Sequence, residues 1–249
     1  MAAVALVTGA SAGLGAEFAQ QLAAKGERLV LVARRRERLD ELAAALGNAR
    51  AVAMDLSEPG AAARLMADLE QHGDTVELLV NNAGFGLAGQ FAELDGDRQR
   101  EMIDLNCGAL AELAHAVLPG MMTRKAGGIL NVASTAAFQP GPGMAVYFAT
   151  KAFVLSFSEA LHDEVNRHGV KVSCLCPGPT RTEFRSVSGF DPKGRLAKLS
   201  ADAASVVAAG LRALERNQAV VVPGMSNKMI AQAHRLLPRA MMRRAARMR

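Results

Sequence analysis

The chain has 249 residues, of which 50% are hydrophobic but only 4% aromatic, and its net charge at pH 7 is +5. This length and composition predict one domain with a large core of aliphatic side chains. Residues 224–249 carry seven Lys and Arg residues and no acid, which leaves residues 1–223 with a net charge of −2. The body of the chain is therefore not basic, and we expect no nucleic-acid partner.

Short apolar runs alternate along the chain with longer stretches of helical periodicity, such as residues 15–26, 35–47 and 61–73. Seven of these runs are predicted as strands: residues 4–9, 28–34, 50–56, 76–84, 127–134, 170–178 and 219–224. Strands that are apolar on both faces and alternate with helices are typical of a covered parallel sheet. The sequence therefore predicts an α/β, single-domain Rossmann-type three-layer fold, a seven-stranded parallel sheet with helices on both faces. Residues 1–223 are expected to form its body, and residues 224–249 a basic amphipathic extension of the same domain.

A glycine-rich turn, TGASAGLG from Thr8 to Gly15, directly follows the first predicted strand and precedes a predicted helix. Glycines let the backbone approach a ligand closely, and the free N–H groups of the helix N-terminus attract a phosphate. Many turns between a strand and a helix need glycine only for its backbone freedom, so the surrounding strand and helix carry the prediction. We expect a nucleotide to contact this turn through Gly9, Ser11, Ala12, Gly13, Leu14 and Gly15.

Two arginines, Arg34 and Arg35, stand at the end of the second predicted strand. A dinucleotide fold that prefers NAD places an acid there for the ribose hydroxyls, but no acid occurs between Glu27 and Glu37. A guanidinium suits the additional 2′-phosphate of NADP. The alternative is a solvated basic helix start, although basic residues are unfavourable in the first turn of a helix. The sequence favours NADP as the cofactor.

The only tyrosine of the chain, Tyr147, precedes Lys151 by one helical turn. Residues at this spacing share a helix face, so the ammonium is expected to lower the phenol pKa by up to about three units before burial opposes it. Such a phenol could exchange protons near neutral pH. The alternative is that the ring only packs and the lysine extends to solvent, because this spacing often arises by chance.

Further polar and small residues follow the ends of other predicted strands, where open α/β sheets bind ligands. Ser134 ends the fifth strand, and its hydroxyl could hold a carbonyl or carbinol beside the phenol. Asn106 lies inside a predicted helix, a position that suits asparagine poorly and so indicates a specific partner. The cofactor site is expected to be walled by Asn82, Ala83 and Gly84 and, after the sixth strand, by Pro177, Gly178, Thr180 and Thr182, with the two threonines at the nicotinamide end.

With its glycine turn and its Asn-Ser-Tyr-Lys tetrad, the chain resembles the short-chain dehydrogenase/reductase family from Val4 to about Val222. The resemblance implies that Tyr147 is the general acid-base and that Ser134 orients the carbonyl. It also implies that Lys151 lowers the phenol pKa and binds the nicotinamide ribose, and that Asn106 holds a water in a proton relay.

In the same way, the resemblance implies that the pair Asp55 and Leu56 contacts the adenine. The segments around Arg35 and Tyr147 resemble NADP-preferring members that act on ketones, including 3-oxoacyl and 3-hydroxy acid substrates. A homodimer or homotetramer through the helices that carry Asn106 and Tyr147 is implied as well.

An NADP(H)-dependent enzyme that interconverts a carbonyl and a secondary alcohol is the function expected. The alternatives are a non-catalytic NADP(H)-sensing protein, which would typically lack the tyrosine or the lysine, and a membrane-surface reductase of a lipid-like ketone. The histidines lack metal-ligand spacing, so no metal is expected. Three cysteines and no signal peptide predict a cytoplasmic protein.

Two segments near the end of the chain leave several interpretations open. Residues 186–199 form a Gly/Ser-rich segment of mixed charge, predicted as a loop over the site or a surface connection. In residues 224–249, apolar and basic residues recur at helical spacing up to a break at Pro238. This tail could cover the substrate pocket, lie on an anionic membrane or be a solvated end. We expect its first half to lie near the loop at 186–199 and its Arg-rich end to contact an anionic surface or a partner subunit.

Overall fold

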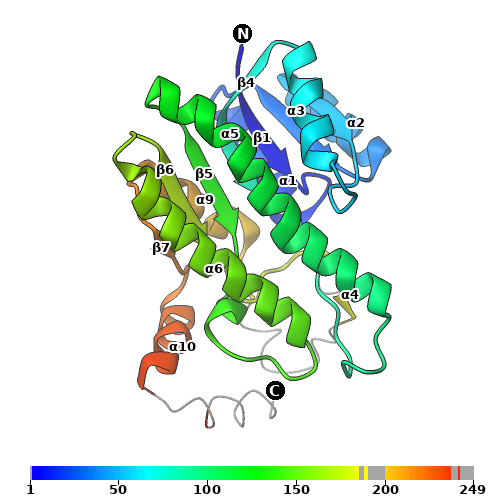
Figure 1. Cartoon of the computed structure of the whole chain (residues 1–249), viewed down its shortest axis with the longest axis vertical. Helices are drawn as coiled ribbons and strands as arrows, with labels where there is room; N and C mark the ends of the chain where they lie inside the picture. Colours follow the sequence, from blue (N-terminus) through cyan, green and yellow to red (C-terminus); the bar gives the residue numbers. More distant parts are fainter. Residues whose placement is uncertain (1, 185–187, 190–199, 237–240, 242–249) are drawn as a thin grey trace.

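A computed structural model describes residues 2–184, 188–189, 200–236 and 241, and its centre is a parallel sheet (Figure 1). The seven strands are β1 (Ala2–Thr8), β2 (Leu29–Ala33), β3 (Ala49–Ala53), β4 (Asp74–Asn81), β5 (Gly128–Val132), β6 (Lys171–Leu175) and β7 (Val220–Val221). Their order is β3-β2-β1-β4-β5-β6-β7, and every neighbouring pair is parallel. The predicted fold class is confirmed.

Helices cover both faces of the sheet in two apolar layers (Figure 1). Three helices pack against one face: α3 (Ala61–Gln71), α5 (Leu110–Arg124) and α6 (Ala145–Asn166). Three pack against the other: α1 (Gly13–Ala24), α2 (Arg36–Leu46) and α9 (Ala203–Glu215). The core is aliphatic, as the composition predicts, and Phe18 is the largest side chain among its fully buried members.

The strand order reverses between β1 and β4, which opens a crevice at the carboxyl ends of the strands. A short helix, α4 (Gly96–Ile103), a π-helical turn, η1 (Asp104–Ala109), and a 3₁₀ turn, η2 (Thr135–Phe138), lie at this end of the molecule. The predicted strands at 50–56 and 219–224 are longer than the observed β3 and β7. The interior strands β5 and β6 are also shorter than the predicted 127–134 and 170–178, because the chain after each of them leaves the sheet and lines the cavity.

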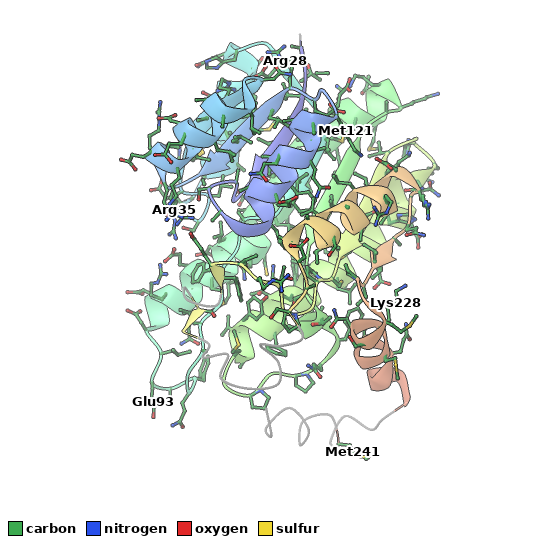
Figure 2. The ribbon with its side chains drawn as sticks, turned by 180° about the vertical axis from the view of Figure 1, so that it is seen from behind. Arg28, Arg35, Glu93, Met121, Lys228 and Met241 are labelled. Carbon is green, nitrogen blue, oxygen red and sulfur yellow. The ribbon has the colours of Figure 1, made fainter. Side chains whose placement is uncertain are left out.

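The chain after β7 begins with α10 (Met225–Leu236), which contacts η2. Met225 and Met229 are 73% and 69% exposed on it, and Lys228 points outward on the same helix (Figure 2). The expected contact of the Arg-rich end with a membrane or partner falls on residues 237–240 and 242–249, outside the described residues. No helix in the described part of the chain has the length and apolar character that crossing a membrane requires.

Candidate active site

The glycine turn joins β1 to α1 with two residues in the left-handed region, Gly9 at φ +66° and Gly13 at φ +58°. Gly15 serves a different purpose, because a Cβ placed there would stand 2.1 Å from the carbonyl oxygen of Gly9. The first turn of α1 can therefore pack directly on the loop. No side chain caps the N-terminus of α1, so its first N–H groups remain available to an anion.

Hydrogen bonds fasten this turn to the end of β4. The Thr8 hydroxyl donates to the Val80 carbonyl over 3.3 Å and accepts from the backbone N–H groups of Asn82 and Ala83, each over 3.0 Å. The Asn82 amide donates to the carbonyl oxygens of Thr8 and Gly9 over 3.0 and 3.3 Å. Because β1 and β4 flank the crevice, these bonds fix the floor of the site.

A single cavity of about 960 Å³ runs along the carboxyl ends of the strands. It gathers most of the predicted site residues: Gly9, Ser11, Ala12, Gly13, Leu14, Arg34, Arg35, Asn82, Gly84, Ser134, Tyr147, Lys151, Pro177, Gly178, Thr180 and Thr182. A second hollow of about 60 Å³ adjoins it and takes in Asp55, Leu56 and Ala83. Gly15 and Asn106 line neither cavity. Thr182 lies against Gly13 at the glycine turn.

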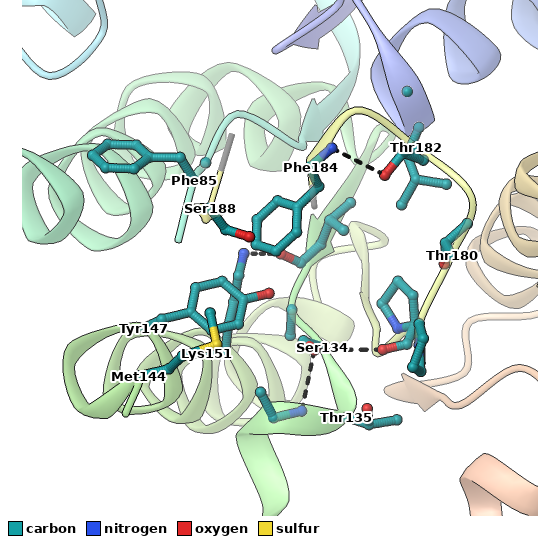
Figure 3. Close-up of a pocket in the computed structure, with 18 of the residues that line it drawn as sticks. Phe85, Ser134, Thr135, Met144, Tyr147, Lys151, Thr180, Thr182, Phe184 and Ser188 are labelled. Carbon is teal, nitrogen blue, oxygen red and sulfur yellow. Dashed lines mark hydrogen bonds between the residues drawn. The ribbon is translucent and has the colours of Figure 1, made fainter. Parts of the chain in front are cut away.

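Ser134, Tyr147 and Lys151 point toward one part of this cavity (Figure 3). Ser134 follows β5 and caps η2, where its hydroxyl accepts from the Ala136 N–H over 3.1 Å. Tyr147 and Lys151 lie one turn apart on α6, only 8% and 6% exposed. The Lys151 ammonium donates to the Val132 carbonyl over 2.9 Å and lies 5.9 Å from the centre of the Tyr147 ring. A hydroxyl, a phenol and an ammonium thus meet at one end of the cavity.

Burial controls the protonation of this group. It raises the pKa of Tyr147 to about 12, and a hydrogen bond with Ser134 lowers that pKa by a smaller amount. It also lowers the pKa of Lys151 to about 8, opposed by the surrounding thiols of Cys107, Cys174 and Cys176. The sequence predicts a lowered phenol pKa, but the structure shows the opposite, because removal of water around the phenol outweighs the hydrogen bond with Ser134. At neutral pH the phenol is protonated and can donate a proton.

The lowered pKa of Lys151 gives a prediction for stability. Below pH 8 the folded protein carries a buried charge at a free-energy cost, and this cost falls as pH rises from about 8 toward the ordinary lysine pKa of 10.5. We expect the free energy of unfolding of the unmodified protein, relative to Lys151→Met, to rise by about 2 kcal/mol between pH 8 and pH 10. Urea titrations of both proteins at several pH values measure this difference, and a flat or falling difference would contradict the prediction.

Asn106 lies in η1, 1% exposed and behind the cavity wall. Its amide oxygen accepts from the Phe85 N–H over 3.1 Å, and its amide nitrogen donates to the Phe85 carbonyl over 2.9 Å and to the Thr150 hydroxyl over 3.0 Å. The sequence predicts a specific partner for Asn106, and the structure shows two, the backbone of Phe85 and the hydroxyl of Thr150 on α6. Through these bonds Asn106 ties the chain after β4 to the helix that carries Tyr147.

The apolar end of the cavity is made by residues that the sequence analysis does not identify. Phe184 lies 5.3 Å from Tyr147 between ring centres, and Phe148 lies 6.0 Å from it. Phe85 and Met144 pack in the same cluster (Figure 3). Phe148 and Met144 lie within four residues of Tyr147 in the chain, so the sequence could have indicated their place beside it. Phe85 and Phe184 come from distant segments, and only the fold brings them there.

The two predicted cofactor arginines lie at the opposite end of the cavity. Arg34 donates to Glu101 over 2.9 Å and to Asp55 over 3.5 Å. Arg35 donates to the Ser11 hydroxyl through Nε over 3.2 Å and through Nη2 over 3.1 Å, and to Glu183 over 3.0 Å. Arg35 therefore borders the glycine turn, and Arg34 borders the small hollow. Among the described residues, no group of three or more His, Cys, Asp or Glu side chains could hold a metal ion.

Comparison with known proteins identifies the family. Residues 3–191 match the short chain dehydrogenase family. The NADP-dependent 3-hydroxy acid dehydrogenase of Escherichia coli is 37% identical over 198 residues, which cover 78% of this chain and 80% of that protein.

Two solved structures extend the similarity to most of the chain. The short-chain dehydrogenase from Sphingobium yanoikuyae in complex with NADPH has a TM-score of 0.84 and 34% identity, covering 95% of this chain and 94% of that one. The bulky-bulky ketone specific alcohol dehydrogenase from Comamonas testosteroni has a TM-score of 0.79 and 31% identity, covering 93% and 92%. The chain belongs to the short chain dehydrogenase family.

Proposed function

We propose that this protein is an NADP(H)-dependent oxidoreductase that transfers a hydride between the nicotinamide and a carbonyl or secondary alcohol. The observation that carries the proposal is one continuous cavity, with a glycine turn and two arginines at one end and Ser134, Tyr147 and Lys151 at the other. Consumption of NADPH in the presence of a panel of ketones, 3-oxoacyl esters and 3-hydroxy acids tests the proposal and ranks these substrate classes.

A dinucleotide fits the residues that line this cavity. The uncapped N-terminus of α1 and the turn at Gly9 and Gly13 suit the pyrophosphate, because N–H groups are available and the glycines add no side chain of their own. Arg34 and Arg35 suit a 2′-phosphate, and the hollow at Asp55 suits the adenine. When bound, the nicotinamide supplies or accepts the hydride.

The residues at the other end would handle the proton. The Ser134 hydroxyl would hold the carbonyl oxygen, and the protonated Tyr147 phenol would donate to that oxygen as negative charge develops on it. The Lys151 ammonium, close beneath the ring, would stabilise the phenolate that remains. Phe184 and Phe148 would exclude water and favour a substrate with an apolar group beside its carbonyl.

A non-catalytic NADP(H)-sensing protein is the alternative. It would need the cofactor end of the cavity but not the hydroxyl, phenol and ammonium together at the other end. These three groups are all present and converge, which supports an enzyme.

The choice of cofactor gives a second prediction. Arg34→Asp combined with Arg35→Ala is expected to weaken NADPH binding about 10²-fold, because charge-assisted hydrogen bonds to the 2′-phosphate are lost. Calorimetric titration with NADPH and NADH measures the effect. Arg36→Ala is the matched control, since Arg36 pairs with Asp40 and does not line the cavity. Equal affinity of the unmodified protein for NADPH and NADH would refute the NADP preference.

We also propose that residues 224–249 belong to the catalytic domain, because Ser226 and Asn227 on α10 line the cavity. A homodimer or homotetramer through the helices around Asn106 and Tyr147 is supported by exposed apolar side chains there, Ile103 and Phe153, which are 43% and 42% exposed. The three cysteines are free, which suits a reducing compartment such as the cytoplasm.

A further inference from the structure

The segment after β6 lines the cavity and contacts both the glycine turn and α2. Thr182 lies on the glycine turn, because a Cβ on Gly13 would stand 3.2 Å from the Thr182 Cβ. The next residue, Glu183, reaches α2 with its carboxylate. That carboxylate accepts from Arg38 Nη1 over 2.7 and 3.0 Å and from Arg35 Nη1 over 3.0 Å.

These ion pairs join residues that lie far apart in the chain, because Glu183 is 145 positions from Arg38 and 148 positions from Arg35. All three side chains are exposed to solvent. Figure 2 shows Arg35 at the edge of the molecule in that view, and Arg35 is one of the residues that line the cavity. The other donors of Arg35 are already placed on Ser11 of the glycine turn. Glu183 therefore occupies the remaining terminal nitrogen of Arg35, Nη1, at the end of the cavity proposed for the 2′-phosphate.

A carboxylate and a phosphate bind to a guanidinium through the same hydrogen-bond donors. Both are anions with oxygens spaced to accept from its fork, and a phosphate dianion carries more charge. The two arginines lower the pKa of Glu183, mainly through the hydrogen bond from Arg38, so the carboxylate is ionised at neutral pH. Two anions held on the same pair of arginines would repel each other, so the cofactor phosphate cannot use these donors while Glu183 keeps them.

We propose that Glu183 competes within the chain with the 2′-phosphate of the cofactor for Arg35 and Arg38. In the cofactor-free protein its carboxylate holds both arginines and fastens the segment after β6 to α2. Binding of the 2′-phosphate displaces the carboxylate and releases this fastening, whereas a cofactor without the phosphate leaves it in place. The inference rests on the proposed use of NADP(H), and it makes Glu183 and Arg38 determinants of how tightly the phosphorylated cofactor is held.

The test compares Glu183→Gln with the unmodified protein by calorimetric titration, independently of activity. The probes are adenosine 2′,5′-bisphosphate and adenosine 5′-monophosphate, which differ by the 2′-phosphate. Removing the carboxylate charge is expected to tighten binding of the bisphosphate about three- to tenfold and to leave the monophosphate unchanged, as for the loss of one or two exposed ion pairs. Glu215→Gln is the matched control, because it removes the same charge from an exposed pair with Lys25 beyond the far end of α1.

Each outcome decides the proposal. Tighter binding of the bisphosphate alone, seen with Glu183→Gln and not with Glu215→Gln, supports it. Unchanged or weaker binding of the bisphosphate overturns it and would mean that Glu183 positions the arginines for the cofactor or has no part in binding. If the unmodified protein does not prefer the bisphosphate to the monophosphate, the proposed use of NADP(H) fails and this inference fails with it.

Discussion

Tyr147→Phe is expected to lower kcat at least ~10²-fold and to leave NADPH binding nearly unchanged. The substitution removes the hydroxyl that we propose gives a proton to the substrate. It keeps the ring, which lies 5.3 Å from Phe184 and 6.0 Å from Phe148 between centres, so the apolar end of the cavity retains its shape. The expected loss is therefore chemical and should appear in turnover more than in affinity.

Steady-state kinetics on the best ketone of the panel, together with NADPH titration, measures both quantities. Thermal unfolding of the variant checks that the fold is intact. Because burial lowers the pKa of Lys151 to about 8, reduction should begin to weaken above pH 8 as the ammonium loses its proton, although the phenol, whose pKa is raised to about 12, is still protonated there. Near-normal turnover of Tyr147→Phe would show that the phenol is not the acid.

Gly15→Ala is expected to lower the free energy of unfolding by about 3 kcal/mol and to abolish measurable NADPH binding. The added Cβ would stand 2.1 Å from the Gly9 carbonyl oxygen and 2.6 Å from the Asn82 amide nitrogen. The first of these is backbone and cannot turn away, so either the glycine turn or the start of α1 must shift. That shift would displace the N–H groups proposed to hold the pyrophosphate.

Gly96→Ala is the matched control for this change. Gly96 also begins a helix, α4, but a Cβ there meets nothing within 4 Å. Its stability should therefore change by less than about 0.5 kcal/mol. Chemical denaturation measures the stability of both variants, and NADPH titration measures their affinity for the cofactor. If Gly15→Ala matches Gly96→Ala in both measurements, the glycine turn does not need the close packing that Gly15 allows.

The fold could be predicted from the sequence because its signals are local. Each strand of the sheet interior is a short apolar run bounded by turn residues, and the helices between them show clear periodicity. The ends of the strands could not be predicted, because they depend on where the chain leaves the sheet: the predicted strands at 50–56 and 170–178 are longer than the observed β3 and β6. The π-helical turn that holds Asn106 also depends on distant partners, the Phe85 backbone and Thr150.

The site could be predicted in part, for the same physical reason. The pairing of Tyr147 with Lys151 follows from their spacing, and Ser134 follows from its place after a strand. The protonation of the phenol could not be predicted, because it depends on how much water the folded chain removes around it. The contact of Glu183 with Arg35 and Arg38 is equally beyond a sequence reading, since it joins two segments that only the fold brings together.

Transfer of deuterium tests the central claim most directly. The protein is incubated with NADPH deuterated at C4 of the nicotinamide and an apolar ketone, and the product is analysed by mass spectrometry. We predict that the alcohol formed by the unmodified protein carries deuterium on its carbinol carbon, and that Tyr147→Phe forms at least ~10²-fold less of it under the same conditions. Binding of NADPH without deuterium transfer to any ketone, oxoacyl ester or aldehyde of the panel would contradict the proposed function and favour a sensing protein.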